Sequence, residues 1–181
     1  MKELKPAFRF LAIFVGLYLG LNILYGLWIS VYDLQVDPAT TIVTRQSAII
    51  LNFLGENTHT KPKESSPSIS ILNSSGVVVS VFEGCNGINV MIVFVSFIFA
   101  FGGERRKIAW FVPVGLILIY LSNLARVIVL YFVATSWKEY FYYVHKYVLT
   151  AFLYLLVFVL WWLWIEKISG ISLRKVMTNK E

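Results

Sequence analysis

The sequence predicts an all-α membrane protein with about four transmembrane helices and both termini in the cytoplasm. Of its 181 residues, 58% are hydrophobic and only 14% are charged. Soluble domains have roughly a quarter charged residues, so this surplus of apolar surface needs lipid to cover it. The chain is long enough for one domain, and we expect residues 1–181 to form a single integral membrane domain.

Four segments are apolar enough to cross a bilayer, which takes about 20 residues of helix. In each, the side chains are apolar nearly all round, as expected for a helix among lipids or other helices. The first segment has a longer apolar run than the roughly 7–15 residues of a signal peptide, so we expect it to be retained as a span. The expected spans are residues 8–31, 87–101, 108–134 and 146–165.

The lysine and arginine residues predict the orientation of these spans. Three basic clusters fall on one side of the membrane if there are four spans, and the positive-inside rule makes that side the cytoplasm. We interpret the net charge of +6 as a topology signal rather than as a nucleic-acid-binding surface. The expected location is the inner, cytoplasmic membrane. The basic residues are Lys2, Lys5 and Arg9 near the start, Arg105, Arg106 and Lys107 between the second and third spans, and Lys167, Arg174, Lys175 and Lys180 in the tail.

The first outer loop, residues 32–84, carries a predicted amphipathic helix. Asp37 followed by Pro38 is typical of a helix N-cap with proline in the first turn. Apolar residues then recur at helical spacing, which predicts a short helix lying on the outer membrane surface. These residues are Ile42, Ile49, Ile50, Phe53 and Leu54.

The second half of this loop is predicted to hold a polar linker and a short β-hairpin. Residues 57–68 are polar and contain two prolines, a composition that permits disorder. Two runs rich in β-branched residues, 69–72 and 77–82, flank a polar turn that ends in Gly76. The second run leads the chain to Cys85.

Three residues are candidates for chemistry, although each alone has an ordinary structural interpretation. Cys85, the only cysteine, precedes the second span, where a helix N-terminus lowers the pKa of a thiol; alone it is more simply a small buried apolar residue. Arg126 lies within the third span, where a charge is costly unless it faces a cavity or a partner, although a long side chain also snorkels to the surface. His145 lies at the outer end of the fourth span, where a lone histidine is more often inert than catalytic.

The combination of these residues predicts an active site for acyl transfer. They stand on three different helices at nearly the same depth on the outer side, which is where the site is expected to face. Cysteine serves as a nucleophile and histidine as a general acid or base. Arginine stays protonated and suits an oxyanion or a bound carboxylate.

Two further residues are second-tier candidates. Glu83 would orient His145 or bind substrate, or else it is a solvated acid of the loop. Asn123 would position Arg126, or else it mediates helix packing.

These motifs resemble those of the exosortase and archaeosortase family. Their order, spacing and membrane setting look like the family's invariant cysteine, arginine and histidine, over about residues 82–162. The chain looks like a small, core-only member, with Asn86 where many members have serine or alanine. The residues that carry the resemblance are Glu83-Gly84-Cys85-Asn86-Gly87, Asn123-Leu124-Ala125-Arg126-Val127 and His145.

The resemblance implies a membrane-embedded cysteine protease or transpeptidase. Such enzymes process exported proteins that end in a sorting tail, which consists of a short motif, a transmembrane helix and a basic cluster. The tail is cut near the outer surface, and the protein is passed to a lipid or glycan anchor. By this resemblance Cys85 is the nucleophile, His145 the acid or base, and Arg126 the group that stabilises substrate or transition state. No cofactor and no metal are expected.

Other classes of function compete with this interpretation. A non-enzymatic membrane scaffold or assembly factor would make no use of thiol chemistry. A transporter or channel is disfavoured, because the polar intramembrane groups occur at one depth rather than along a path. A zinc hydrolase is disfavoured because the sequence has no His-Glu-x-x-His motif.

Overall fold

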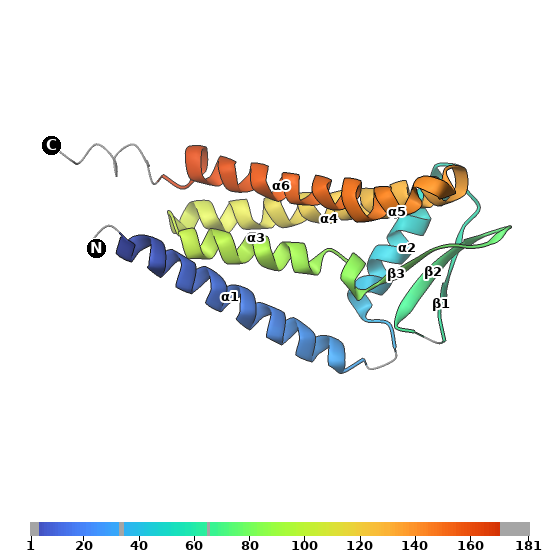
Figure 1. Cartoon of the computed structure of the whole chain (residues 1–181), viewed down its shortest axis with the longest axis horizontal. Coiled ribbons are helices and arrows are strands. Elements are labelled where there is room, and N and C mark those ends of the chain that lie inside the picture. Colours follow the sequence, from blue (N-terminus) through green and yellow to red (C-terminus); the bar gives the residue numbers. More distant parts are fainter. Residues whose placement is uncertain (1–3, 33–34, 65, 171–181) are drawn as a thin grey trace. The chain divides into compact units, whose positions relative to one another are not determined.

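The structure is a computed structural model that describes residues 4–32, 35–64 and 66–170, and its elements fall into two compact units (Figure 1). Among the described residues, the first unit contains 4–25, 89–119 and 154–170. The second unit contains residues 26–88 and 120–153.

The first unit is built from apolar helices. Its core is rich in aromatic side chains, and a Cβ on Gly115 would overlap the ring of Phe94, so glycine allows two helices to meet there. The indole Nε1 of Trp164 donates a hydrogen bond to the carbonyl of Gly102, 3.1 Å away. The helices that supply this unit are α1 (Leu4–Ser30), α3 (Ile88–Phe101), α4 (Arg105–Ser136) and α6 (Leu149–Leu163).

Within the described residues, three helical stretches are long and apolar enough to cross a membrane, so the chain is a membrane protein. Two of them are α1 and α4. The third runs from Lys138 to Ile168. It comprises η2 (Lys138–Tyr140), α5 (Phe141–Tyr143), η3 (Val144–Val148), α6 and η4 (Trp164–Ile168).

The expected second span corresponds to α3, which is apolar but has only 14 residues, fewer than the roughly 20 that cross a bilayer as a helix. The count of four spans and the cytoplasmic placement of both termini therefore stay predictions. Several basic residues on which the orientation depends lie outside the described residues, namely Lys2, Arg174, Lys175 and Lys180.

The second unit combines α2 and the second half of α4 with an antiparallel sheet in the order β1-β2-β3 (Figure 1). The predicted hairpin is present, and its two strands turn at Ser74 and Ser75. Apolar residues of the sheet, of α2 and of α4 share one core, which includes Leu51, Ile71 and Tyr131. The elements are α2 (Pro38–Phe53), β1 (His59–Pro62), β2 (Ser68–Asn73) and β3 (Gly76–Phe82).

The linker predicted at residues 57–68 is wrong in part, because residues 59–62 form the strand β1. Asn52, near the end of α2, directs the chain into this strand. Its Oδ1 accepts a hydrogen bond from the N–H of Thr58 at 2.6 Å, and its Nδ2 donates to the Thr58 carbonyl at 2.9 Å. The strand has little apolar side chain of its own, so pairing with β2 rather than a hydrophobic pattern makes it a strand.

The helix α2 begins where the sequence predicted, and Asp37 caps it by accepting a hydrogen bond from the N–H of Thr40 at 2.9 Å. Its buried face carries Val43 and Leu51 together with small and hydroxyl residues. The hydroxyls of Thr44 and Ser47 donate to carbonyls of the helix itself, which satisfies them inside the unit. Other large apolar side chains of the helix and of its C-cap are exposed, and these are Ile42, Ile49, Phe53 and Leu54.

We expect this exposed apolar face to contact lipid. A nitroxide spin label at Phe53→Cys, placed in a Cys85→Ser background, should collide more with oxygen, which partitions into lipid, than with a water-soluble nickel chelate. A label at Lys61→Cys on β1 is the control and should show the opposite order. Equal accessibility of both labels to the nickel chelate would mean that α2 lies in water.

Candidate active site

Cys85 lies in a single 3₁₀ turn that follows the sheet. This turn, η1 (Glu83–Cys85), comes directly after β3, and Asn86 ends it. The Oδ1 of Asn86 accepts a hydrogen bond from the N–H of Ile88 at 3.0 Å, and its Nδ2 donates to Oγ1 of Thr40 at 3.3 Å. Asn86 thus caps the start of α3 and ties the cysteine turn to α2.

Asn123 of α4 holds the same turn through another contact. Its Nδ2 donates a hydrogen bond to the carbonyl of Cys85 at 2.9 Å, and its side chain is fully buried. Gly87 makes this approach possible. It has φ of +86°, and a Cβ there would lie 3.1 Å from Cγ of Asn123. The hydrogen bond of Asn123 therefore goes to the cysteine turn, a contact that the sequence did not suggest.

His145 reaches the cysteine from a widened helical turn. It lies in η3, a π-helical turn, and its carbonyl accepts a hydrogen bond from Oγ1 of Thr150 at 3.1 Å. Turns of this kind occur frequently at functional sites. The imidazole stacks on the ring of Phe141 with centroids 5.8 Å apart, and its Nε2 lies 4.0 Å from Sγ of Cys85. This distance is long for a hydrogen bond, as is common before a substrate tightens the site.

Arg126 supplies a positive charge with unused hydrogen-bonding capacity. It lies on α4 three residues after Asn123, so the two side chains share a face of the helix. Its side chain is half-buried, and its Nε is buried without a hydrogen-bond partner in the described part of the chain. A buried donor left without a partner is costly, which makes this position suited to an incoming oxygen atom.

All three candidate residues line one cavity of about 260 Å³ within the second unit. Five consecutive residues of β3, Val78–Phe82, form one wall, and α4, α5 and η3 form the other. The structure therefore brings together Cys85, Arg126 and His145. Glu83 is not part of this lining and lies half-buried in the turn before the cysteine.

The surroundings of Cys85 raise the pKa of its thiol above the ordinary value, so the low pKa expected at a helix N-terminus is wrong. Burial is the largest cause, because the thiolate loses its hydration. The charge of Arg126 and the backbone N–H of Phe82 both favour the thiolate and offset part of this effect. At neutral pH the sulfur is therefore a protonated thiol, and a base must remove its proton before it attacks a carbonyl.

This arrangement is suited to nucleophilic acyl chemistry. A sulfur nucleophile, a nitrogen base and a cationic hydrogen-bond donor face the same small space. Among the described residues, no group of three or more His, Cys, Asp or Glu side chains is placed to hold a metal ion.

Sequence reasoning missed several residues that build the site. Asn86 could have been predicted as a helix cap, because it precedes the apolar run that begins at Ile88 and Asn is a common residue at this position. Nothing in the sequence indicated that Thr40 or Phe141 belongs to the site. Thr40 lies 46 positions from Asn86, so only the folded chain reveals that the two side chains meet.

A sequence model of the transmembrane exosortase family matches residues 6–165. This match spans most of the chain and includes all three candidate residues. The chain belongs to the transmembrane exosortase family. For this exosortase, the similarity thus extends beyond residues 82–162 to α1, α2 and the sheet. Comparison with curated proteins and with solved structures found no match.

We expect Gly87→Ala to destabilise the exosortase by about 1–3 kcal/mol, because alanine is strained at positive φ and its Cβ would press on Asn123. The free energy of unfolding measured by titration with a denaturing detergent would test this. Gly26→Ala is the control, because its added Cβ would meet nothing within 4 Å. Similar unfolding free energies for the two variants would contradict the proposed role of Gly87.

We also expect Arg126→Ala to raise the pKa of Cys85 further, because the lost positive charge favoured the thiolate. At a fixed pH the thiolate fraction falls, so the profile of alkylation rate against pH should shift to higher pH. Arg126→Lys, which keeps a positive charge, should restore most of the shift. A midpoint that is unchanged or lower in Arg126→Ala would show that the two groups do not interact.

Proposed function

We propose that this exosortase-family protein is a cysteine transpeptidase or protease that cleaves C-terminal sorting tails of exported proteins. The observation that carries the proposal is the single cavity shared by Cys85, Arg126 and His145, with Sγ of the cysteine 4.0 Å from Nε2 of the histidine. Family membership supports the same assignment. The roles below are those that the chemistry of each side chain allows.

In the first half of the reaction, His145 takes the proton from the thiol of Cys85 and the sulfur attacks the carbonyl carbon of the scissile peptide bond. A bond forms between sulfur and carbon, and the carbonyl oxygen becomes an oxyanion. The carbon–nitrogen bond then breaks as His145 returns the proton to the departing amine. The products are a thioester on Cys85 and the released tail.

In the second half, an acceptor replaces the tail. A hydroxyl or amine of a lipid or glycan anchor, or a water molecule, gives its proton to His145 and attacks the thioester carbon. The carbon–sulfur bond breaks, and the sulfur regains its proton from His145. Transfer to an anchor is the outcome we propose, and hydrolysis is the same reaction with water as the acceptor.

Arg126 is the group that stabilises negative charge in this scheme. Its Nε has no partner in the described part of the chain and is buried, so it can donate to the oxyanion without first giving up another bond. The high pKa of the cysteine fits the same scheme. The sulfur needs both a base and a nearby cation to react at neutral pH.

The substrates in this proposal are exported proteins with a short motif, a transmembrane helix and a basic cluster at their C-terminal end. Their scissile motif would lie just outside the bilayer. We propose accordingly that the cavity faces the extracytoplasmic side of the inner membrane, which matches the basic clusters that predict cytoplasmic termini.

The competing function is a non-enzymatic membrane scaffold or assembly factor. In a scaffold, Cys85 would be a packing residue whose reactivity does not depend on His145 or Arg126. The shared cavity and the orphaned Nε of Arg126 favour an enzyme, because packing alone requires neither.

We expect Cys85→Ala and Cys85→Ser to insert into the membrane but to leave precursors with intact C-terminal tails, when each variant replaces the native copy in its source cell. His145→Gln should slow processing by about 10²–10⁴-fold, the usual contribution of a general acid or base. The measurement is the size of tail-bearing precursor proteins on immunoblots.

Lys146→Ala is the matched control, since Lys146 is adjacent to the histidine but exposed. It should process substrate at the normal rate. Normal processing by Cys85→Ala would exclude the cysteine mechanism and favour the scaffold.

A further inference from the structure

The strand β3 has one edge that no other strand covers. In the sheet order β1-β2-β3 it pairs with β2 alone among the described residues. Its last five residues, Val78–Phe82, line the cavity that holds Cys85. An open strand edge presents backbone N–H and C=O groups that are available to another extended chain.

The hydrogen-bonding pattern of β2 shows which groups of β3 face this open edge. The carbonyl of Ser68 accepts a hydrogen bond from the N–H of Lys63, 2.9 Å away, on the β1 side. Because backbone groups alternate in direction along a strand, those of Ile69 and Ile71 face β3. Pro62 is consistent with this register. It lies opposite Ile69, whose backbone groups face β3, so the N–H that proline lacks is not needed for pairing with β2.

The partners of Ile69 and Ile71 on β3 are Val81 and Val79, so these residues bond to β2. Ser80 and Phe82 lie between and after them, and their N–H and C=O groups therefore point away from β2. Phe82 and Cys85 line the same cavity, and the backbone N–H of Phe82 favours the thiolate of Cys85, so this edge ends beside the nucleophile.

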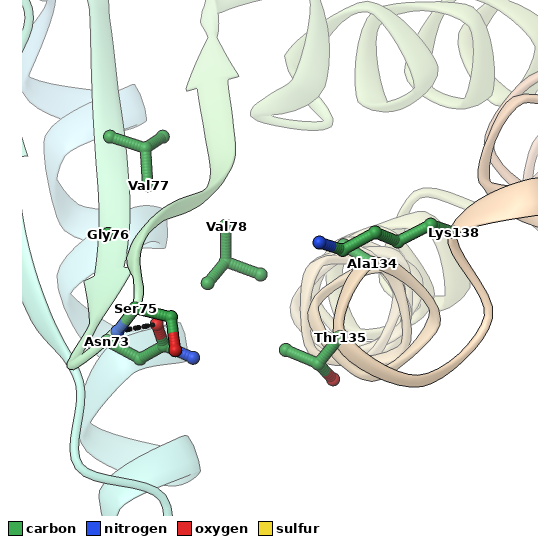
Figure 2. Close-up of a pocket in the computed structure, with 8 residues that line it drawn as sticks. All are labelled: Asn73, Ser75, Gly76, Val77, Val78, Ala134, Thr135 and Lys138. Atoms are coloured by element: carbon green, nitrogen blue, oxygen red, sulfur yellow. Dashed lines mark hydrogen bonds between the residues drawn. The ribbon is translucent and has the colours of Figure 1, made fainter.

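A second cavity continues the open edge toward the hairpin turn. It has a volume of about 250 Å³ and is lined by Gly76, Val77 and Val78 on one side and by Ala134, Thr135 and Lys138 on the other. Figure 2 shows the ammonium group of Lys138 extending across this space toward the strand that carries Val78. Val78 lines both cavities, so the two follow β3 from one end to the other.

We propose that the substrate binds as an additional strand along the open edge of β3, with its main chain hydrogen-bonded to the N–H and C=O of Ser80 and to the C=O of Phe82, and with its scissile carbonyl delivered to Cys85. This inference rests on the proposed function and specifies how the tail motif is held. The occupant is an extended peptide, because the exposed groups are an alternating row of backbone donors and acceptors beside a nucleophile that follows the strand directly.

Strand addition also fits the chemistry of the cavity walls. Apart from the reactive groups, the wall that faces β3 is apolar and includes Val127, Leu130 and Phe141. Arg126 is the exception, and its unpartnered Nε suits the carbonyl oxygen at which the added strand ends. Main-chain bonds would provide affinity for any extended peptide, and the apolar wall would select side chains.

The first test uses the wild-type protein and a peptide whose backbone can be modified. The probe is acetyl-Val-Ala-Val-Ala chloromethyl ketone; Cys85 forms a carbon–sulfur bond with it, chloride leaves, and the thiol proton goes to the buffer. It should label Cys85 faster than chloroacetone does, which carries the same reactive group without a peptide. N-methylation of one backbone amide of the peptide removes one main-chain hydrogen bond to β3 and should slow labelling about fivefold. Successive N–H groups of a strand point in opposite directions, so only methylation at every second residue should have this effect.

The outcomes separate this inference from the proposed function. Labelling by chloroacetamide that depends on His145 and Arg126, without alternation in the N-methyl series, would overturn strand addition and leave the catalytic proposal standing. A peptide ketone that labels Cys85 no faster than chloroacetone would overturn it as well. A thiol whose reaction with chloroacetamide is independent of both side chains would overturn the catalytic proposal.

A second test changes the strand. Ser80→Pro removes one outward N–H without touching the ladder to β2, and proline is tolerated on strand edges. The rate of peptide labelling relative to chloroacetamide labelling should fall about fivefold. Ser70→Ala is the matched control, because it breaks the same 2.9 Å hydroxyl contact between Ser70 and Ser80 from the β2 side. If Ser80→Pro and Ser70→Ala have the same ratio of peptide labelling to chloroacetamide labelling, the proposal is overturned. If Ser80→Pro does not fold, the N-methylated peptides provide the test.

Discussion

The hydrogen bond from Nδ2 of Asn123 to the carbonyl of Cys85 fixes the nucleophile against the helix that also carries Arg126. It forms only because Gly87 adopts a positive φ and leaves room for the asparagine side chain. With this contact in place, one turn of α4 sets both the backbone of the cysteine and the guanidinium beside it. The positions of the nucleophile and the cation are therefore coupled through a single rigid helix.

The strand β3 has two roles that its alternating geometry keeps separate. Val79 and Val81 are buried in the core of the second unit and bond to β2. The residues between and after them direct their backbone groups to the cavity. A small sheet in a mostly helical membrane protein thus supplies what helices lack, since a helix uses its backbone groups internally. The turn η1 follows this strand directly and carries the cysteine.

Much of the architecture could be predicted from the sequence, and the predictions that were wrong or missing have physical reasons. Hydropathy located the helices, and Asp37 with Pro38 located the start of α2. The strand β1 was missed because it depends on a side chain of α2, Asn52, to direct it. The three candidate residues were chosen by type and expected depth, and their shared cavity required the fold. The raised pKa of Cys85 was missed because burial cannot be read from position in a helix.

The protonated state of Cys85 has a consequence for its chemical stability in the extracytoplasmic orientation proposed above. Thiolates rather than thiols react with oxidants, and no cytosolic reductant protects an extracytoplasmic cysteine. The chain has no second cysteine to form a disulfide with a sulfenic acid, so oxidation would need an external thiol for repair. Cys85 is only 8% exposed and its pKa is raised, so the sulfur stays in the thiol form, which oxidants attack least. The low reactivity of the buried thiol thus also protects Cys85 from oxidation.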